Sequence, residues 1–234
     1  MTARLPVFPL GTVLFPGLVL PLHIFEERYR ALVRHLVGLP EGAAREFGVL
    51  AIQSGWEVAT AGPPGRSGPA GGEVTLHDVG CTAELRQVTE LADGGFDIVT
   101  VGRRRFRVAE VDDAAAPYLT AEVEWLPEPA GTDEVADLLA ARVISVFRQY
   151  LGLVRPDPQE ISEQLPEDPT VLSHLVAATA ALTVDDRQRL LAVDDTAGRL
   201  RAELRLLNRE TALLRQIRAV PVPLSELAGP PVPN

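Results

Sequence analysis

The sequence predicts an α+β protein in which a β-rich N-terminal half, closed into a small barrel or sandwich, precedes a helical C-terminal half. Two observations lead to this prediction. Up to about residue 126, short runs of alternating apolar and polar side chains are separated by turns that contain glycine or proline. Beyond "PEPAGT" (residues 127–132), apolar residues recur at the spacing of amphipathic helices.

The first segment, residues 5–25, contains no Asp, Glu, Lys or Arg and is interrupted by four prolines. It is long enough to cross a bilayer, but the prolines would leave backbone carbonyls unpaired in the hydrocarbon. It also lacks the uninterrupted apolar core and the cleavage motif of a secretory signal. We therefore predict short strands joined by turns, the clearest turn being Phe15–Pro16–Gly17.

A helix and then further strands follow. "FGVLAI" (47–52) predicts a buried strand, and the glycine- and proline-rich segment 61–72 predicts a surface loop. The turn Asp93–Gly94–Gly95, between two alternating runs, predicts a hairpin. The helix before these strands ends near Gly38, and its expected apolar face consists of Phe25, Tyr29, Leu32, Val33 and Leu36.

Four helices are expected in the second half. They start near Thr132, at Pro169 after Asp168, after the cap residue Thr183, and near Thr196. We expect three segments: 1–127 as the β-rich domain, 132–218 as a helical bundle and 219–234 as a flexible tail. The expected buried stripe of the first helix is Val135, Leu138, Leu139, Val143, Val146, Phe147 and Tyr150; that of the last is Leu200, Leu204, Leu207, Leu214 and Ile217, with arginines outward.

Composition excludes several functions. All 22 basic side chains are arginine, so there is no lysine for a phosphate-binding loop, a Ser–Lys dyad or a Schiff base. A net charge of −10 disfavours general nucleic-acid binding. The single cysteine, Cys81, cannot form an internal disulfide and fits a reducing compartment, so we predict a cytoplasmic protein.

No catalytic or metal-binding motif is evident. His77, Asp78 and Cys81 lack the second half of a zinc site, and Ser173–His174 lies outside any G-x-S-x-G context. We therefore expect no catalytic residue, no metal and no cofactor; an enzyme using carboxylates in a cleft has no motif behind it.

The opening "LPVFPLGTVLFPGLVLPLHIFEERYRALV" resembles the start of the Lon protease N-terminal (substrate-binding) domain family, which begins with an L-P-x-x-P-L piece, a V-L-F-P-G turn and a P-L strand. "FGVLAI", "VGCTAELRQVTEL" and "DGGFDIVTVGRRRFRV" look like its later strands, and the resemblance covers residues 4–218. It implies a PUA-like β-barrel followed by a helical bundle, without the ATPase and peptidase domains that follow this region in Lon.

The resemblance implies a non-catalytic module that binds unfolded or exposed apolar protein segments, and it leaves open a separate protease or chaperone as a further partner. No membrane partner is expected. A sheet edge or apolar groove could take an extended chain by strand addition. The candidate lining residues are Phe15, Pro16, Leu18 and Trp56.

An RNA-binding function remains the alternative, because PUA-like folds also occur in RNA-binding proteins. In "RRRFR" (103–107) an aromatic side chain between arginines could stack on a base. Alternation places Phe106 and Val108 on the core face, and Arg105 and Arg107 on the solvent face, as in any exposed strand. The nucleic-acid candidates are Arg103, Arg104, Arg105 and Arg107.

Overall fold

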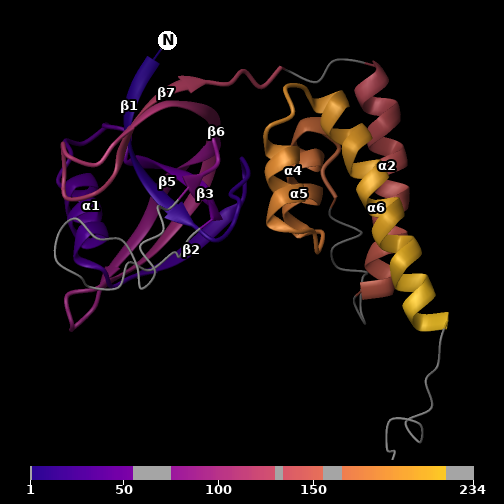
Figure 1. The fold of residues 1–234 in the computed structure, drawn as a ribbon, viewed down its shortest axis with the longest axis horizontal. Coiled ribbons are helices and arrows are strands. Elements are labelled where there is room, and N and C mark those ends of the chain that lie inside the picture. Colours follow the sequence, from indigo (N-terminus) through magenta and orange to yellow (C-terminus); the bar gives the residue numbers. More distant parts are fainter. Residues whose placement is uncertain (1, 55–74, 130–133, 155–164, 220–234) are drawn as a thin grey trace, which may run out of the picture.

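The computed structural model of the chain describes residues 2–54, 75–129, 134–154 and 165–219. Strands and one helix come first, and the remaining helices follow, so the predicted order is confirmed (Figure 1). The first group is β1 (Thr2–Leu10), β2 (Val19–Ile24), α1 (Glu27–Val37), β3 (Glu46–Ser54), β4 (Thr75–Leu76), β5 (Val79–Glu90), β6 (Phe96–Asp112) and β7 (Thr120–Trp125). The second is α2 (Glu134–Val154), α4 (Pro169–Thr179), α5 (Val184–Leu191) and α6 (Thr196–Ala219).

Five of the strands form a closed ring of pairings. The path runs from β1 through β7, β6, β5 and β3, and β3 pairs back to β1 in parallel, with Val7 opposite Gly48. The other four ring pairings are antiparallel. Strand β2 pairs with β6 outside this ring, and the short β4 pairs with β3. Closure leaves the ring strands with neighbours on both sides, which protects them from edge-to-edge association.

Helix α1 covers one end of the strand half. Tyr29 stacks on Phe8, with ring centroids 3.8 Å apart, and both contribute to a core shared by α1 and the sheet. Four of the expected apolar positions are buried, but Phe25 is 50% exposed. The reason is that α1 begins only at Glu27, so Phe25 precedes the helix and does not share its buried face.

A second core lies around Phe106, which is fully buried among side chains of β1, β3 and β7. The Phe106 ring lies so close to Gly48 and Gly80 that a Cβ atom at either would come within 2.6 Å of it.

The two predicted turns are confirmed. Gly17 has φ +80°, and the hairpin turn is closed by a 2.9 Å backbone hydrogen bond from Leu91 N–H to the Gly95 carbonyl.

Helices α2, α4 and α6 pack around a third core. Two expected members of the α2 stripe are wrong, because Val135 and Leu138 are exposed, the latter by 70%, while Ala136 and Ala140 take the buried positions. The predicted starts of α4 at Pro169 and of α5 after the cap residue Thr183 are confirmed; Asp168 accepts from backbone N–H groups of α4, and Thr183 from one of α5. Thr132 lies outside the described residues. None of the helices described is long and apolar enough to cross a membrane.

The chain crossing at Gly102 generates a stability prediction. A Cβ atom at Gly102 would lie 2.1 Å from the carbonyl oxygen of Phe15. The two chain segments are also joined here by two backbone hydrogen bonds of 2.8 Å, one from Gly17 N–H to the Gly102 carbonyl and one from Gly102 N–H to the Leu18 carbonyl. Gly102→Ala must displace backbone, so we expect it to lower the free energy of unfolding by about 2–4 kcal/mol.

The matched control is Gly152→Ala in α2, where a Cβ would meet nothing within 4 Å. This variant should raise the free energy of unfolding by about 0.5–1 kcal/mol, because alanine is the better helix former. Urea denaturation of both proteins measures the two values. Equal stability of the two variants would contradict the packing at Gly102.

Candidate polypeptide-binding surface

An exposed apolar surface lies where β2 pairs with β6. In this register Val19 lies opposite Val101 and Pro21 opposite Val99. Val19 is 62% exposed, Pro21 is exposed, and Val99 and Val101 are half-buried. Because paired residues share a face of a sheet, these four side chains form one patch, which we call the apolar strip.

One end of the apolar strip opens into a shallow pocket of about 340 Å³. Pro21 and Val99 line it together with the polar pair His23 and Asp97, whose Nδ1 and Oδ1 atoms are 2.7 Å apart. Phe25 lies beside His23, with ring centroids 6.2 Å apart. The pocket therefore combines apolar walls with one half-exposed carboxylate.

Among the described residues β2 pairs with β6 alone, and its opposite edge is poorly suited to strand addition. The carbonyls of Leu18 and Leu20 accept hydrogen bonds from β6, so the backbone groups of the alternate residues Val19, Pro21 and His23 face away from β6. Pro21 has no N–H, so an added strand would find no donor at the centre of this edge. A bound chain is better held by side-chain contacts with the apolar strip than by strand addition.

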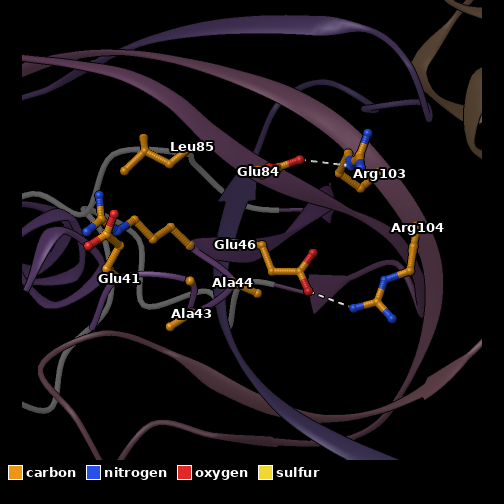
Figure 2. A pocket seen from close by; sticks show the side chains of 10 residues that line it. Glu41, Ala43, Ala44, Glu46, Glu84, Leu85, Arg103 and Arg104 are labelled. Carbon is orange, nitrogen blue, oxygen red and sulfur yellow. Dashed lines mark hydrogen bonds and ion pairs between the residues drawn. The ribbon is translucent and has the colours of Figure 1, made fainter. Parts of the chain in front are cut away.

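The other end of the apolar strip carries basic side chains. Arg103 Nε lies 2.8 Å from Glu84 Oε2, and Arg86 Nη2 lies 3.1 Å from the same oxygen. Figure 2 shows Arg103 directed toward Glu84, and Arg104 toward Glu46, at a larger pocket of about 650 Å³. The loop 41–45 forms another wall of this pocket.

Each exposed arginine of "RRRFR" has an acidic partner. Arg104 lies 2.7 Å from Glu46 and stacks over the Trp125 ring, 3.8 Å from its centroid. Arg107 lies 3.9 Å from Asp78, and Arg103 binds Glu84 as described above. These pairs offset most of the positive charge of the run, so it does not form the unpaired basic patch that RNA binding requires.

The prediction that Arg105 faces solvent is wrong. Its side chain is 1% exposed. A β-bulge places Arg103 and Arg104 opposite the single residue Thr82, so that Ala83 pairs with Gly102 and Cys81 with Arg105. Because Ala83 and Cys81 share a face, Gly102 and Arg105 also share one although they are three residues apart. At Arg105 this face meets the helical half, whereas Ala83 and Cys81 belong to the core shared with α1.

Arg105 connects the two halves of the molecule through five hydrogen bonds. Its Nε donates to Glu128 Oε2 at 2.6 Å. The other four N–H groups donate to the backbone carbonyls of Pro127, before α2, of Leu191, the last residue of α5, and of Val193 and Asp194, just after it. Every guanidinium donor therefore has an acceptor, which is what a buried arginine requires.

Glu128 holds a second buried arginine and a histidine at the same place. Its Oε1 accepts from Arg199 at 2.9 Å and lies 3.2 Å from His174 Nε2. Burial opposes the ionised carboxylate, but the His174 hydrogen bond and the charges of Arg199 and Arg105 outweigh it and lower the pKa of Glu128 to about 2. Burial lowers the pKa of His174, so the imidazole is held neutral. We call Arg105, Glu128, His174 and Arg199 the interface network.

Glu203 lies one helical turn after Arg199 and is 1% exposed. Neither of its carboxyl oxygens has a hydrogen-bond partner among the residues that the structure describes. Burial raises the pKa of Glu203 well above its usual value, and the nearby charge of Arg199 opposes this rise. Burial therefore favours the protonated carboxyl of Glu203, and its ionisation in the folded protein costs stability.

The four residues predicted to line a peptide site differ in burial and position. Phe15 is fully buried against Ala177, Leu190 and other residues of the helical half, so the expectation that it contacts a peptide is wrong. Pro16 and Leu18 are half-buried at the turn that leads into β2, and Leu18 packs against the core. Trp56 lies outside the described residues.

The position of the apolar strip at the surface is not predicted from the sequence. The sequence contains one indication of it: in β6 the residues Asp97, Val99, Val101 and Arg103 share a face, and two of them are apolar although the opposite face already carries Ile98.

Ser173 has a structural role, since its hydroxyl donates to Thr170 O and accepts from Arg199. Within the described ranges, no group of three or more His, Cys, Asp or Glu side chains could hold a metal ion.

Comparison with known proteins gives a consistent result. Residues 4–209 match the family model of the ATP-dependent protease La (LON) substrate-binding domain. Lon protease of Escherichia coli (strain K12) is 27% identical over 215 residues, which are 91% of this chain and 25% of that protein. Lon protease of Anaeromyxobacter dehalogenans is 26% identical over 217 residues, 91% of this chain and 24% of that protein. The chain thus spans about a quarter of the length of the curated relatives it matches.

Two solved structures share this fold. A Lon N-terminal domain protein from Xanthomonas campestris aligns with a TM-score of 0.61 and 26% identity, covering 87% of this chain and 98% of that one. The N-terminal domain of Mycobacterium avium complex Lon protease also aligns at 0.61, with 23% identity over 90% of this chain and 98% of its own. The fold of Lon N-terminal domains is therefore confirmed.

The five donors of Arg105 can be tested by a substitution that keeps the charge. Arg105→Lys provides three donors in a different geometry and leaves buried carbonyls unpaired. We expect it to lower the free energy of unfolding by about 2–4 kcal/mol. Arg107→Lys, at the exposed partner of Asp78 on the same strand, should change it by less than about 0.5 kcal/mol. Urea denaturation compares the two, and similar small losses would contradict the interface network.

The buried carboxyl of Glu203 predicts a pH-dependent effect on stability. Because its pKa is higher in the folded than in the unfolded protein, the free energy of unfolding should fall as pH rises above the unfolded value of 4.5 toward the folded one. Glu203→Gln removes this loss, so the stability of the variant relative to the wild type should increase as pH rises above 4.5. Urea denaturation of both proteins at several pH values measures this stability difference. If the difference does not change with pH, the raised pKa of Glu203 is contradicted.

Proposed function

Because the chain belongs to the ATP-dependent protease La (LON) substrate-binding domain family, we propose that it is a non-catalytic module that binds unfolded or exposed apolar polypeptide segments. The proposed contact surface is the apolar strip together with Phe25 and the adjoining half-buried Pro16 and Leu18. We further propose that the strand half is a PUA-like barrel, that the helical half is a bundle, and that a separate protease or chaperone can receive the bound segment.

The exposure of the apolar strip is the observation that supports this proposal. Val19 and Phe25 are two of the most exposed large apolar side chains of the described residues, at 62% and 50%. Leaving such groups in contact with water costs about 25 cal/mol per Å² of surface that a partner could cover. An exposed, contiguous apolar surface beside a shallow pocket is the kind of site at which proteins bind other chains.

The RNA alternative is less well supported by the arrangement of charges. Three of its four arginines are paired with acidic side chains, and the fourth, Arg105, is buried at the interface between the two halves. An RNA site would need unpaired cations that release counterions on binding. The two functions differ in salt dependence, which any binding experiment can measure.

A peptide-binding measurement tests the proposal. Val99→Glu places a charge at the centre of the apolar strip and should weaken binding of a fluorescent apolar peptide at least about tenfold in an anisotropy titration. Val111→Glu is the matched control, since Val111 is 43% exposed on the same strand but outside the apolar strip; it should leave the affinity unchanged.

Salt separates this proposal from the alternative. Binding of the apolar peptide should persist between about 0.1 M and 1 M salt, because burial of apolar surface is not screened. If no apolar peptide binds at micromolar concentration, the proposal fails. Binding of single-stranded RNA that falls steeply with salt would favour the alternative instead.

A further inference from the structure

The outward face of β6 carries an acidic side chain, two apolar side chains and a basic side chain in that order. From the hairpin onward it presents Asp97, then the apolar pair Val99 and Val101, and then Arg103. At about 3.3 Å per residue, the two charged positions are roughly 20 Å apart. The apolar strip is thus bounded by an acidic group at one end and a basic group at the other.

Both ends keep a net charge after their local pairs are counted. At the basic end, Arg86 and Arg103 share the single carboxylate of Glu84, which leaves one positive charge in excess. At the acidic end, Asp97 Oδ1 lies 2.7 Å from His23 Nδ1, and among the described residues no arginine is paired with the Asp97 carboxylate. The side chains of Asp97 and Arg103 are 57% and 53% exposed, so both remain accessible to a partner.

We propose that the apolar strip binds extended segments with an apolar centre and opposite charges at its two flanks, and that it binds them in one direction. The basic flank of the segment contacts Asp97, and the acidic flank contacts the excess charge on Arg86 and Arg103. The inference rests on the proposed function and adds to it the chemistry and the orientation of the bound segment.

Charge complementarity supports this choice of occupant. Apolar contacts with Val19, Pro21, Val99 and Val101 are non-directional and would accept either chain direction equally. Opposite charges at the two ends remove this equivalence, because a reversed segment places like charges together at both ends. The register of β2 against β6 supplies the length: five to seven residues of an extended chain span the distance between the two ends.

The test compares three capped peptides that share one palindromic apolar centre. The first has arginine at one flank and glutamate at the other, the second has arginine at both flanks, and the third has glutamine at both flanks. We expect the oppositely charged peptide to bind about fivefold more tightly than the neutral one, as two half-exposed ion pairs would give. The peptide with two arginines should bind about as tightly as the neutral one, because one attractive contact is offset by one repulsive contact.

The double variant Asp97→Asn/Arg103→Gln should reduce the preference for the oppositely charged peptide over the neutral one to less than about twofold while leaving the affinity for the neutral peptide unchanged. The matched control is Asp78→Asn/Arg107→Gln, which removes another ion pair at the surface of β6 and should keep the preference. Anisotropy titrations at low salt measure all combinations.

The outcomes separate the two proposals. If the neutral peptide binds but the oppositely charged peptide binds no more tightly, the inference about the charged flanks is overturned and the proposed function stands. A preference that survives in Asp97→Asn/Arg103→Gln also overturns it. If none of the three peptides binds, both proposals fail.

Discussion

The arrangement of this molecule depends on one buried guanidinium. Arg105 projects from β6 into the helical half and donates to Glu128 and to carbonyls before α2, at the end of α5 and just after it. Removing such a group from water is expensive, and the cost is offset only when every donor finds an acceptor. Three of the five acceptors are carbonyls at the end of α5 and just after it, and the other two belong to residues 127–128, which connect the two halves. All five meet only in one placement of the helical half against the sheet. Hydrophobic contacts of Phe15 with the helical half then fill the space beside it.

The same β-bulge that turns Arg105 inward leaves the apolar strip outward. Before the bulge, β6 pairs with β2 and presents Val99 and Val101 to the surface; after it, β6 pairs with β7 and contributes Phe106 to the core. A single extra residue at Arg103–Arg104 thus separates a segment of β6 that is available to a partner from one that is fixed in the interior. Arg103, at the boundary, belongs to the exposed segment and supplies the charge at the end of the apolar strip.

Features set by local chemistry could be predicted from the sequence. The Phe15–Pro16–Gly17 turn, the hairpin before Phe96 and the caps at Asp168 and Thr183 each depend on a few neighbouring residues. Burial that depends on distant partners could not be predicted. Alternation in "RRRFR" gave the wrong surroundings for Arg105, because neither the bulge nor the covering helices are visible in a local pattern. For the same reason local patterning places Phe15 at the surface although it is buried, and does not reveal that the half-buried Val99 faces outward.

The lysine-free composition has a physical consequence at the interface network. A buried lysine readily loses its proton, whereas arginine stays charged in proteins. Arg105 and Arg199 therefore keep Glu128 ionised down to a pKa of about 2, and His174 beside them is held neutral. The contacts between the two halves are accordingly insensitive to pH across the neutral range. Glu203, next to the interface network, is the group whose ionisation makes stability depend on pH. Its carboxyl is buried without a hydrogen-bond partner among the described residues.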